Sequence, residues 1–272
     1  MAKYLIACDD GHGMETAGKR TPPLKEDIKF RGKTFKKGQI IHENDFNENI
    51  MEKFIAGCKR CGIDTLQVAP GDTDVALAIR VKTANNKSAD LYISFHVNAL
   101  DGTKWQEKAY GLVVIKHEVC SSTTDKLATN VYNYLKDGVA WYKDGGTKYK
   151  VRKDTDISGY SLYVLKNTKM PAILVEYGFM DCWEDVKRMC TDKFATDCAE
   201  STLKGVCKTL EVMYKAPTSN TSNSSTTPTK PAEKGVYRVI TGSFTLKDNA
   251  LKEQERLKGL GITSSIVYDV LD

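Results

Sequence analysis

The chain has 272 residues, which is enough for one sizeable core and a small second unit. Its composition, 41% hydrophobic and 28% charged, excludes both a membrane-spanning protein and a broadly disordered one. The net charge of +5 is mild, Lys and Arg are spread along the chain, and no basic block is interleaved with aromatic residues. We therefore predict no nucleic-acid partner and no membrane insertion.

The N-terminal stretch MAKYLIACDD predicts a first strand rather than an export signal, because its apolar run is short and acids follow at once. We therefore expect synthesis in the cytoplasm, where the eight cysteines would be reduced thiols. Cys58 and Cys61 form one C-x-x-C pair, but a structural zinc site needs a second such pair. A redox motif normally opens a helix, whereas this pair stands where a helical pattern ends.

Along the first 215 residues, short apolar runs alternate with helical patterns. The expected strands are Tyr4–Cys8, Thr65–Val68, Leu91–Phe95, Leu112–Ile115 and Ala172–Val175; the expected helices are Asn44–Cys61, Asp74–Asn86, Thr123–Lys136 and a last one with an apolar face from Ala199 to Met213. This alternation predicts an α/β fold, with a mostly parallel twisted sheet covered by helices on both faces.

A change of composition marks a boundary after this domain. Residues 216–234, APTSNTSNSSTTPTKPAEK, contain no large apolar side chain and cannot bury a core, so they predict an extended linker. We expect a main domain over residues 1–215, the linker over 216–234, and a small C-terminal βαβ-type half-module over 235–272.

Polar residues follow several of the predicted strands, at the sheet edge where α/β proteins form their sites. His12 comes after the first strand, His96 after the third and Glu176 after the last. Two imidazoles from different strands suit zinc, which in catalytic sites takes three protein ligands. His42 and Glu43, where a helix begins, are the candidates for the third ligand.

Each of these residues also has an ordinary structural explanation. His12 could be a loop histidine, His96 a hydrogen-bonded core histidine, Glu43 a first-turn carboxylate favoured by the helix dipole, and Glu176 half of an ion pair. Their common position at strand ends favours a site over four coincidences. Other chemistries lack their motifs, because the chain has no G-x-S-x-G, no H-E-x-x-H, no Walker A and no G-x-G-x-x-G after a strand.

Four segments, DDGHG, ENDFN, IRVKTANNKSADLYISFHVNA and MPAILVEYGFMD, occur in the order found in zinc-dependent N-acetylmuramoyl-L-alanine amidases of the amidase-3 family. The first domain resembles these peptidoglycan-cutting enzymes over nearly its whole length. The resemblance implies that His12, Glu43 and His96 hold Zn²⁺, with Asn47 one helical turn past the Glu. It also implies that Glu176 is the catalytic carboxylate.

By this resemblance, the substrate is the amide bond between the lactyl group of N-acetylmuramic acid and L-alanine. Zinc with three protein ligands lowers the pKa of its bound water to about 7 and polarises the carbonyl. Glu176 would take the proton of that water and give it to the leaving amine. The family usually has Pro where this chain has Asp10, a change that removes no ligand, and His42 remains a rival to Glu43.

The tail from Gly235, which begins near YRVITGSF, resembles the first half of a sporulation-related repeat (SPOR) module. Such a tail would bind the cell wall or form a homo-oligomer. A cytoplasmic amidase with this tail resembles a phage endolysin, which acts at the bacterial cell wall after release. The alternatives are a bacterial autolysin or sporulation amidase and, in a different class, a non-catalytic wall-binding protein, against which the intact set of four site residues argues.

Overall fold

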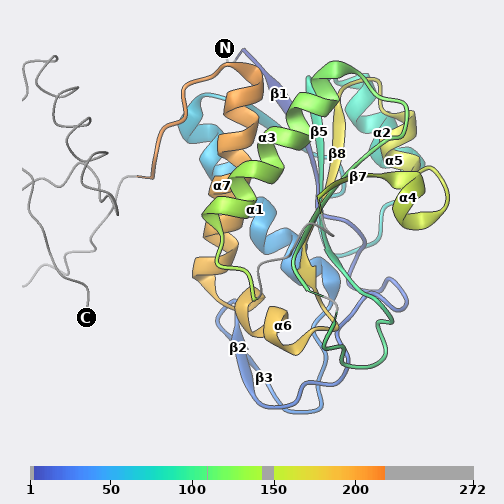
Figure 1. The fold of residues 1–272 in the computed structure, drawn as a ribbon, viewed down its shortest axis with the longest axis vertical. Helices are drawn as coiled ribbons and strands as arrows, with labels where there is room; N and C mark the ends of the chain where they lie inside the picture. Colours follow the sequence, from blue (N-terminus) through green and yellow to red (C-terminus); the bar gives the residue numbers. More distant parts are fainter. Residues whose placement is uncertain (1–2, 109, 143–149, 218–272) are drawn as a thin grey trace, which may run out of the picture. The chain divides into compact units, whose positions relative to one another are not determined.

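The computed structural model describes residues 3–108, 110–142 and 150–217, which lie in a compact unit, Met1–Ser219 (Figure 1). The predicted linker and SPOR-like half-module lie outside these residues, except for the first two positions of the linker. The elements are β1 Leu5–Asp9, β2 Ile28–Phe30, β3 Lys33–Phe35, α1 Glu43–Cys61, β4 Asp64–Gln67, α2 Leu77–Asn86, β5 Leu91–Asn98, β6 Leu112–Lys116, α3 Ser122–Gly138, β7 Val151–Lys153, α4 Asp154–Ser158, α5 Tyr163–Asn167, β8 Ala172–Phe179, α6 Trp183–Met189 and α7 Asp192–Leu210.

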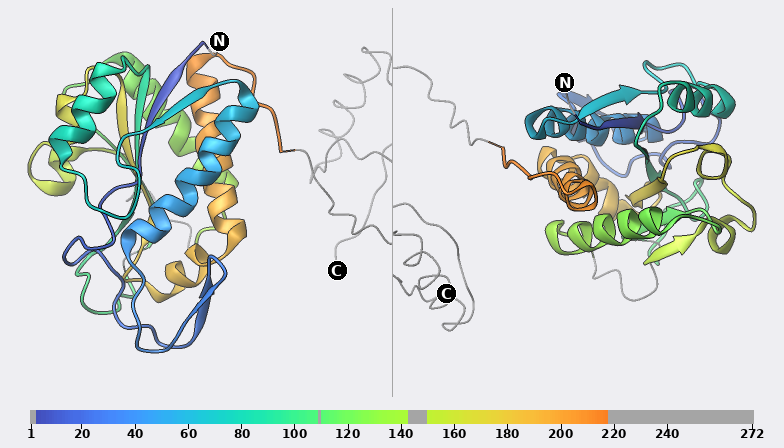
Figure 2. Two further views of the ribbon diagram at one scale, coloured as in Figure 1. Left: turned by 180° about the vertical axis from the view of Figure 1, so that it is seen from behind. Right: turned by 90° about the horizontal axis from the view of Figure 1, so that it is seen from above.

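One six-stranded sheet forms the centre of the described unit, in the order β4-β1-β5-β8-β6-β7. The first four of these strands are parallel, and β6 pairs with β8 in the antiparallel direction. Helices α1, α3 and α7 cover one face, and α2 and α5 cover the other (Figures 1 and 2). The predicted α/β fold with a mostly parallel sheet and helices on both faces is therefore confirmed.

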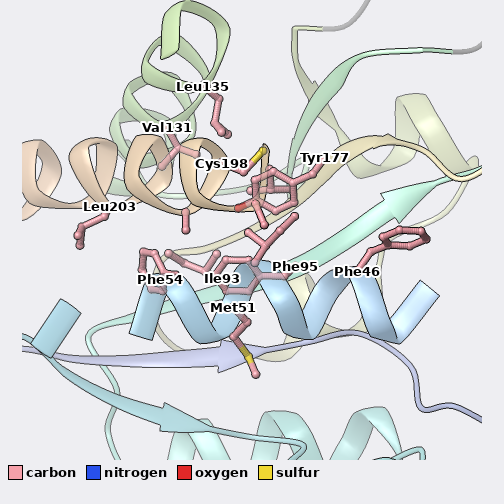
Figure 3. Close-up of a cluster of buried hydrophobic side chains, with 14 of the residues drawn as sticks. Phe46, Met51, Phe54, Ile93, Phe95, Val131, Leu135, Tyr177, Cys198 and Leu203 are labelled. Carbon is pink, nitrogen blue, oxygen red and sulfur yellow. The ribbon is translucent and has the colours of Figure 1, made fainter. Parts of the chain in front are cut away.

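The two cores follow from the alternation of side chains along the buried strands. On β5, Ile93 and Phe95 enter the larger core, where Phe54 of α1 and Leu203 of α7 meet them (Figure 3). Tyr92, the residue before Ile93, points to the opposite face of the sheet and packs in the core beneath α2. Burial of apolar area at roughly 25 cal/mol per Å² makes these two layers the main source of stability.

The last helix begins before the apolar face that the sequence predicts and ends before the last residue of that face. Thr191 caps α7 by accepting a hydrogen bond from the backbone N of Phe194 at 3.2 Å, so the helix begins well before Ala199. Glu211 adopts a left-handed conformation with φ 57° and ends the helix after Leu210. Met213, predicted to lie on the apolar face, is therefore outside the helix and 79% exposed.

All eight cysteines are free thiols, as the sequence predicts. No described helix is long and apolar enough to cross a membrane. The structure also contains elements that the sequence analysis did not predict, namely the short hairpin of β2 and β3, the edge strand β7 and the short helices α4, α5 and α6.

Candidate active site

The loop after β1 places His12 at the edge of the sheet. Two consecutive residues of this loop have a left-handed backbone conformation. Gly11 has φ 45° and His12 has φ 62°. A Cβ atom on Gly11 would lie 2.3 Å from Cε1 of His96, closer than side chains tolerate. Glycine is therefore required there both for the turn and for the approach of the second imidazole.

Three side chains from other elements hold this loop by its carbonyl groups. Asn44 Nδ2 donates to the Gly11 carbonyl at 3.1 Å, and Asn47 Nδ2 donates to the same carbonyl at 3.3 Å. Arg80 Nη2 of α2 donates to the carbonyl of His12 at 3.0 Å. The position of His12 is thus fixed from both α1 and α2, which is how a loop side chain can serve a site of defined geometry.

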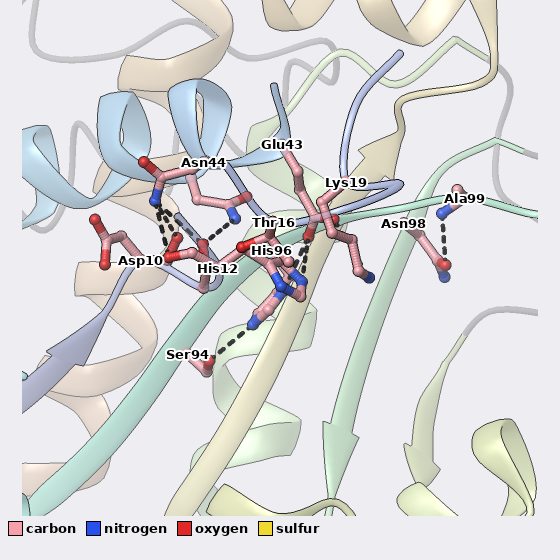
Figure 4. A network of polar contacts seen from close by, with 12 residues as sticks. Asp10, His12, Thr16, Lys19, Glu43, Asn44, Ser94, His96, Asn98 and Ala99 are labelled. Carbon is pink, nitrogen blue, oxygen red and sulfur yellow. Dashed lines mark hydrogen bonds and ion pairs between the residues drawn. The ribbon is translucent and has the colours of Figure 1, made fainter. Parts of the chain in front are cut away.

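Glu43 is the first residue of α1 and is 1% exposed. Its Oε1 lies 2.9 Å from Nδ1 of His96 and 3.4 Å from Nε2 of His12 (Figure 4). Burial acts to raise the pKa of Glu43, but the hydrogen bond and charge of His96, followed by His12, outweigh it and lower the pKa to about 2. The carboxylate is therefore anionic at neutral pH.

These three side chains form the one group of metal-ligand type found among the described residues. One ligand atom from each of His12, Glu43 and His96 lies within 4.8 Å of the others. Burial lowers the pKa of His12 to about 4, with Glu43 opposing that effect, so the imidazole is neutral at pH 7, the form that binds metals. His42, the rival candidate, is instead the residue before α1 and forms an isolated β-bridge with Arg20.

Glu176 lies on β8 directly beside His96 of β5 in the strand register. Burial raises the pKa of Glu176 to about 7; the nearby Glu43 adds to this rise and His96 opposes it. Its Oε2 is buried without a hydrogen-bond partner among the described residues. A carboxyl group with these properties can hold or release a proton near neutral pH.

A buried carboxylate, Asp9 at the end of β1, is hydrogen-bonded to the first half of β5. Its Oδ2 accepts hydrogen bonds from Tyr92 Oη at 2.7 Å and from Ser94 Oγ at 2.8 Å, and its Oδ1 pairs with Arg80. Burial acts to raise the pKa of Asp9, but the Arg80 guanidinium and then His96 outweigh it and hold the pKa below its usual value. Ser94 Oγ also lies 3.0 Å from Nε2 of His96 (Figure 4).

A family model described as Amidase_3, N-acetylmuramoyl-L-alanine amidase, matches residues 6–208, which contain the whole of this arrangement. This chain belongs to that amidase family. The amidase is 28% identical over 217 residues to the endolysin of Bacillus phage SPP1, a match that covers 78% of this chain and 68% of the relative. It is 26% identical over 206 residues to the sporulation-specific N-acetylmuramoyl-L-alanine amidase of Bacillus subtilis strain 168, covering 76% and 68% of the two chains.

Solved structures support the same assignment. The amidase resembles N-acetylmuramoyl-L-alanine amidase AmiC2 of Nostoc punctiforme with a TM-score of 0.59 and 26% identity, over 77% of this chain and 98% of the other. An amidase from Clostridium difficile 630, 24% identical, shares the fold with a TM-score of 0.61, over 78% and 98% of the two chains. The chain is therefore a peptidoglycan amidase.

The structure brings together every site residue that the sequence analysis named except His42. Other residues of the amidase at the site were not predicted from the sequence pattern. Lys19 Nζ lies 3.6 Å from Oε2 of Glu43, and Ser94 touches His96. Asp9 could have been found from the sequence, because it is the last residue of a buried strand. Lys19 could not, because it lies in a loop without a hydrophobic pattern.

Proposed function

We propose that His12, Glu43 and His96 hold one Zn²⁺ and that Glu176 is the proton-transferring group for cleavage of the bond between N-acetylmuramic acid and L-alanine. The observation that carries the proposal is the convergence of three ligand atoms within 4.8 Å, from a loop, a helix and a strand. Glu43 Oε2 is buried without a hydrogen-bond partner among the described residues, and its ion pair with Lys19 is long at 3.6 Å, so a bound cation would offset more of the cost of burial.

The donor set fits zinc in kind as well as in position. Two imidazoles and one carboxylate are a recurring ligand set for catalytic zinc, and three protein ligands leave one place open. Residues around the ligands supply the outer hydrogen bonds that such sites need. Arg80 holds the carbonyl of His12, and Ser94 contacts the imidazole of His96.

The contacts of Ser94 favour one tautomer of His96. The single hydroxyl proton of Ser94 goes to Asp9, a carboxylate that can only accept. Ser94 Oγ must then accept from Nε2–H of His96, 3.0 Å away. In the structure Nδ1 donates to Oε1 of Glu43, 2.9 Å away; a cation that replaced this proton would meet the Nδ1 lone pair, so Nδ1 would be the ligand atom.

When bound, Zn²⁺ supplies Lewis acidity that polarises the amide carbonyl and lowers the pKa of a coordinated water to about 7. Glu176 takes the proton from the attacking water and delivers it to the nitrogen of the leaving L-alanine. Its raised pKa of about 7 suits both steps, since the group must accept a proton and then lose it again. Strand β8 holds it beside His96 without rearrangement.

The test of this mechanism separates chemistry from folding and metal binding. Glu176→Gln keeps the size of the side chain and removes the proton acceptor, so release of peptides from a soluble muropeptide should fall by roughly 100-fold or more. Zinc content should stay at the wild-type level. Glu118→Gln, an exposed site past the end of β6, is the matched control and should keep full activity. Near-normal activity of Glu176→Gln would mean that another group carries the proton.

In its biological setting, we propose that the amidase is a phage endolysin that reaches the wall after release from the cytoplasm. Similarity to the endolysin of Bacillus phage SPP1 supports this role, and the similar sporulation-specific amidase supports the alternative of a bacterial enzyme. Expression inside a susceptible bacterium should leave cells intact until a membrane pore is opened, and lysis should then follow. Lysis without a pore would contradict the endolysin role.

A further inference from the structure

One segment beside the site carries the excess positive charge of the chain. Residues 19–40 contain eight basic and two acidic side chains, whereas the net charge of all 272 residues is only +5. Basic residues occur all along the sequence, but outside this segment acidic residues balance them. The net charge of this segment therefore exceeds that of the whole chain.

The hairpin within this segment is anchored next to the catalytic machinery. Arg31 and Gly32 connect β2 and β3 with φ values of 47° and 75°, as a two-residue hairpin turn requires. Phe30 of β2 is 2% exposed, and its ring lies 4.9 Å from the ring of Phe46 on α1. Phe46 lies one turn after Glu43, so the hairpin stands at the same end of the sheet as the site (Figure 1).

Three lysines of this hairpin and its flank are available to a partner. Lys29, Lys33 and Lys37 are exposed, and none has an ion-pair partner among the described residues. Three other cations of the segment form ion pairs: Lys19 with Glu43, Arg31 with Glu48 and Lys36 with Asp27. The three lysines are therefore free of ion pairs within the described part of the protein, although Lys33 also interacts at longer range with the Asp45 carboxylate.

The surface beside these lysines is an open hollow rather than an enclosed pocket. It has a volume of about 370 Å³ and is lined by Lys33, Thr34, Phe35, Gln39 and Ile40. Its lining offers an ammonium, a hydroxyl, an amide and two apolar side chains. Separate cations along an open surface suit an extended chain with repeated negative charge better than one small anion.

We propose that this cationic hairpin, residues 28–37 with the hollow beside it, binds a phosphodiester-linked anionic polymer attached to peptidoglycan and so holds the amidase on its substrate. The inference rests on the proposed action at the cell wall. Phosphodiester polymers repeat one negative charge per unit, which matches several separate lysines on one exposed hairpin and its flank. Stem peptides mix carboxylates with amines and offer less net charge to it.

The experiment compares two triple variants of the full chain, both made with Glu176→Gln so that walls stay intact. Lys29→Gln/Lys33→Gln/Lys37→Gln removes the available charges of the hairpin. Lys82→Gln/Lys87→Gln/Lys169→Gln removes the same charge from exposed sites away from the hairpin and is the matched control. Binding is measured by sedimentation with purified walls at several salt concentrations, before and after hydrofluoric acid removes the phosphodiester polymers.

The hairpin variant should bind native walls roughly ten to a hundred times more weakly than the control, with a shallower dependence on salt. On stripped walls, the two variants should bind equally. Equal binding to native walls would overturn the proposal, and a defect that persists on stripped walls would assign the lysines to the peptide carboxylates instead.

A second measurement keeps this result separate from the proposed chemistry. With Glu176 intact, the hairpin variant should hydrolyse soluble muropeptides at the wild-type rate, because none of its three lysines contacts the site residues. If the proposed mechanism were wrong, Glu176→Gln would retain activity in this assay, whatever the outcome of wall binding.

Discussion

At the scale of single residues, the tightest constraint in the site is the lack of a side chain at Gly11. A methyl group there would collide with the imidazole of His96 and would also strain a backbone with φ 45°. We expect Gly11→Ala to lose most zinc binding and activity, because His96 must move away from Glu43. Metal analysis and muropeptide hydrolysis measure both effects.

Gly32 provides the control for this prediction. It has φ 75°, and a Cβ atom there would meet nothing within 4 Å. Gly32→Ala should therefore cost only the backbone strain, about 1–2 kcal/mol of unfolding free energy, and should keep full zinc content. Equal loss of zinc in the two variants would show that the collision with His96 is not the cause.

The buried pair of Asp9 and Arg80 gives a second residue-scale prediction. Arg80→Met leaves the Asp9 carboxylate buried without its cation and should lower the unfolding free energy by about 3–5 kcal/mol. Adding Asp9→Asn removes the unpaired charge, so the double variant should be more stable than Arg80→Met alone. Urea unfolding measures all three chains, and a double variant less stable than the single one would contradict the account.

The same pair sets a dependence on pH. Arg80 helps to hold the pKa of Asp9 below its usual value, so its stabilising contribution is fully present above about pH 4 and is lost as the pH falls through the lower folded-state pKa. The stability difference between wild type and Arg80→Met should be largest near neutral pH and should shrink in acid. A difference that grows in acid would contradict this sign.

At the scale of elements, the sequence predicted the strands that matter for the site because they are buried and apolar. The run that ends in Glu176 is almost wholly buried in β8, and His12 after β1 and His96 near the end of β5 come together beside it. The antiparallel direction of β6 was not predictable from its residues, because a buried strand has the same pattern in either direction.

The hairpin of β2 and β3 was not predicted, because its strands are short and mostly exposed. Each of its strands has three residues, of which only Phe30 is fully buried. Its turn is Arg-Gly rather than the Asn-Gly or Asp-Gly that marks most such turns. The contacts of Ser94 and Lys19 also needed the structure, because they join residues of different elements.

The contact between α3 and α7 gives a prediction at this scale. A Cβ atom on Gly205 of α7 would lie 2.6 Å from Cα of Val131 on α3, which is backbone and cannot turn aside. Gly205→Ala should therefore destabilise the domain by about 1–3 kcal/mol, despite the better helix propensity of Ala. Gly57→Ala on α1 meets the flexible end of Leu203 and should cost less. Thermal unfolding compares the two, and a larger loss for Gly57→Ala would contradict this view of the packing.

At the scale of the whole molecule, the amidase unit should function without the residues that follow it. Lys215 closes this unit, because its carbonyl accepts a hydrogen bond from Arg60 at 2.7 Å and its backbone N lies 3.3 Å from Sγ of Cys61. Deletion of residues 218–272 keeps these contacts and should preserve zinc content and hydrolysis of soluble muropeptides. Whole-cell lysis should fall if the tail raises local concentration at the wall. Equal lysis by both chains would contradict a targeting role for the tail.

The zinc site is tested most directly by the amount of zinc that the full chain holds. After zinc is supplied and excess is removed, metal analysis should find one Zn²⁺ per chain in the wild type and in Glu176→Gln, and almost none in a folded His96→Ala variant. Chelation should abolish hydrolysis by the wild type, and added zinc should restore it. An empty wild-type site, or His96→Ala that binds zinc as tightly as the wild type, would contradict a zinc site built from His12, Glu43 and His96.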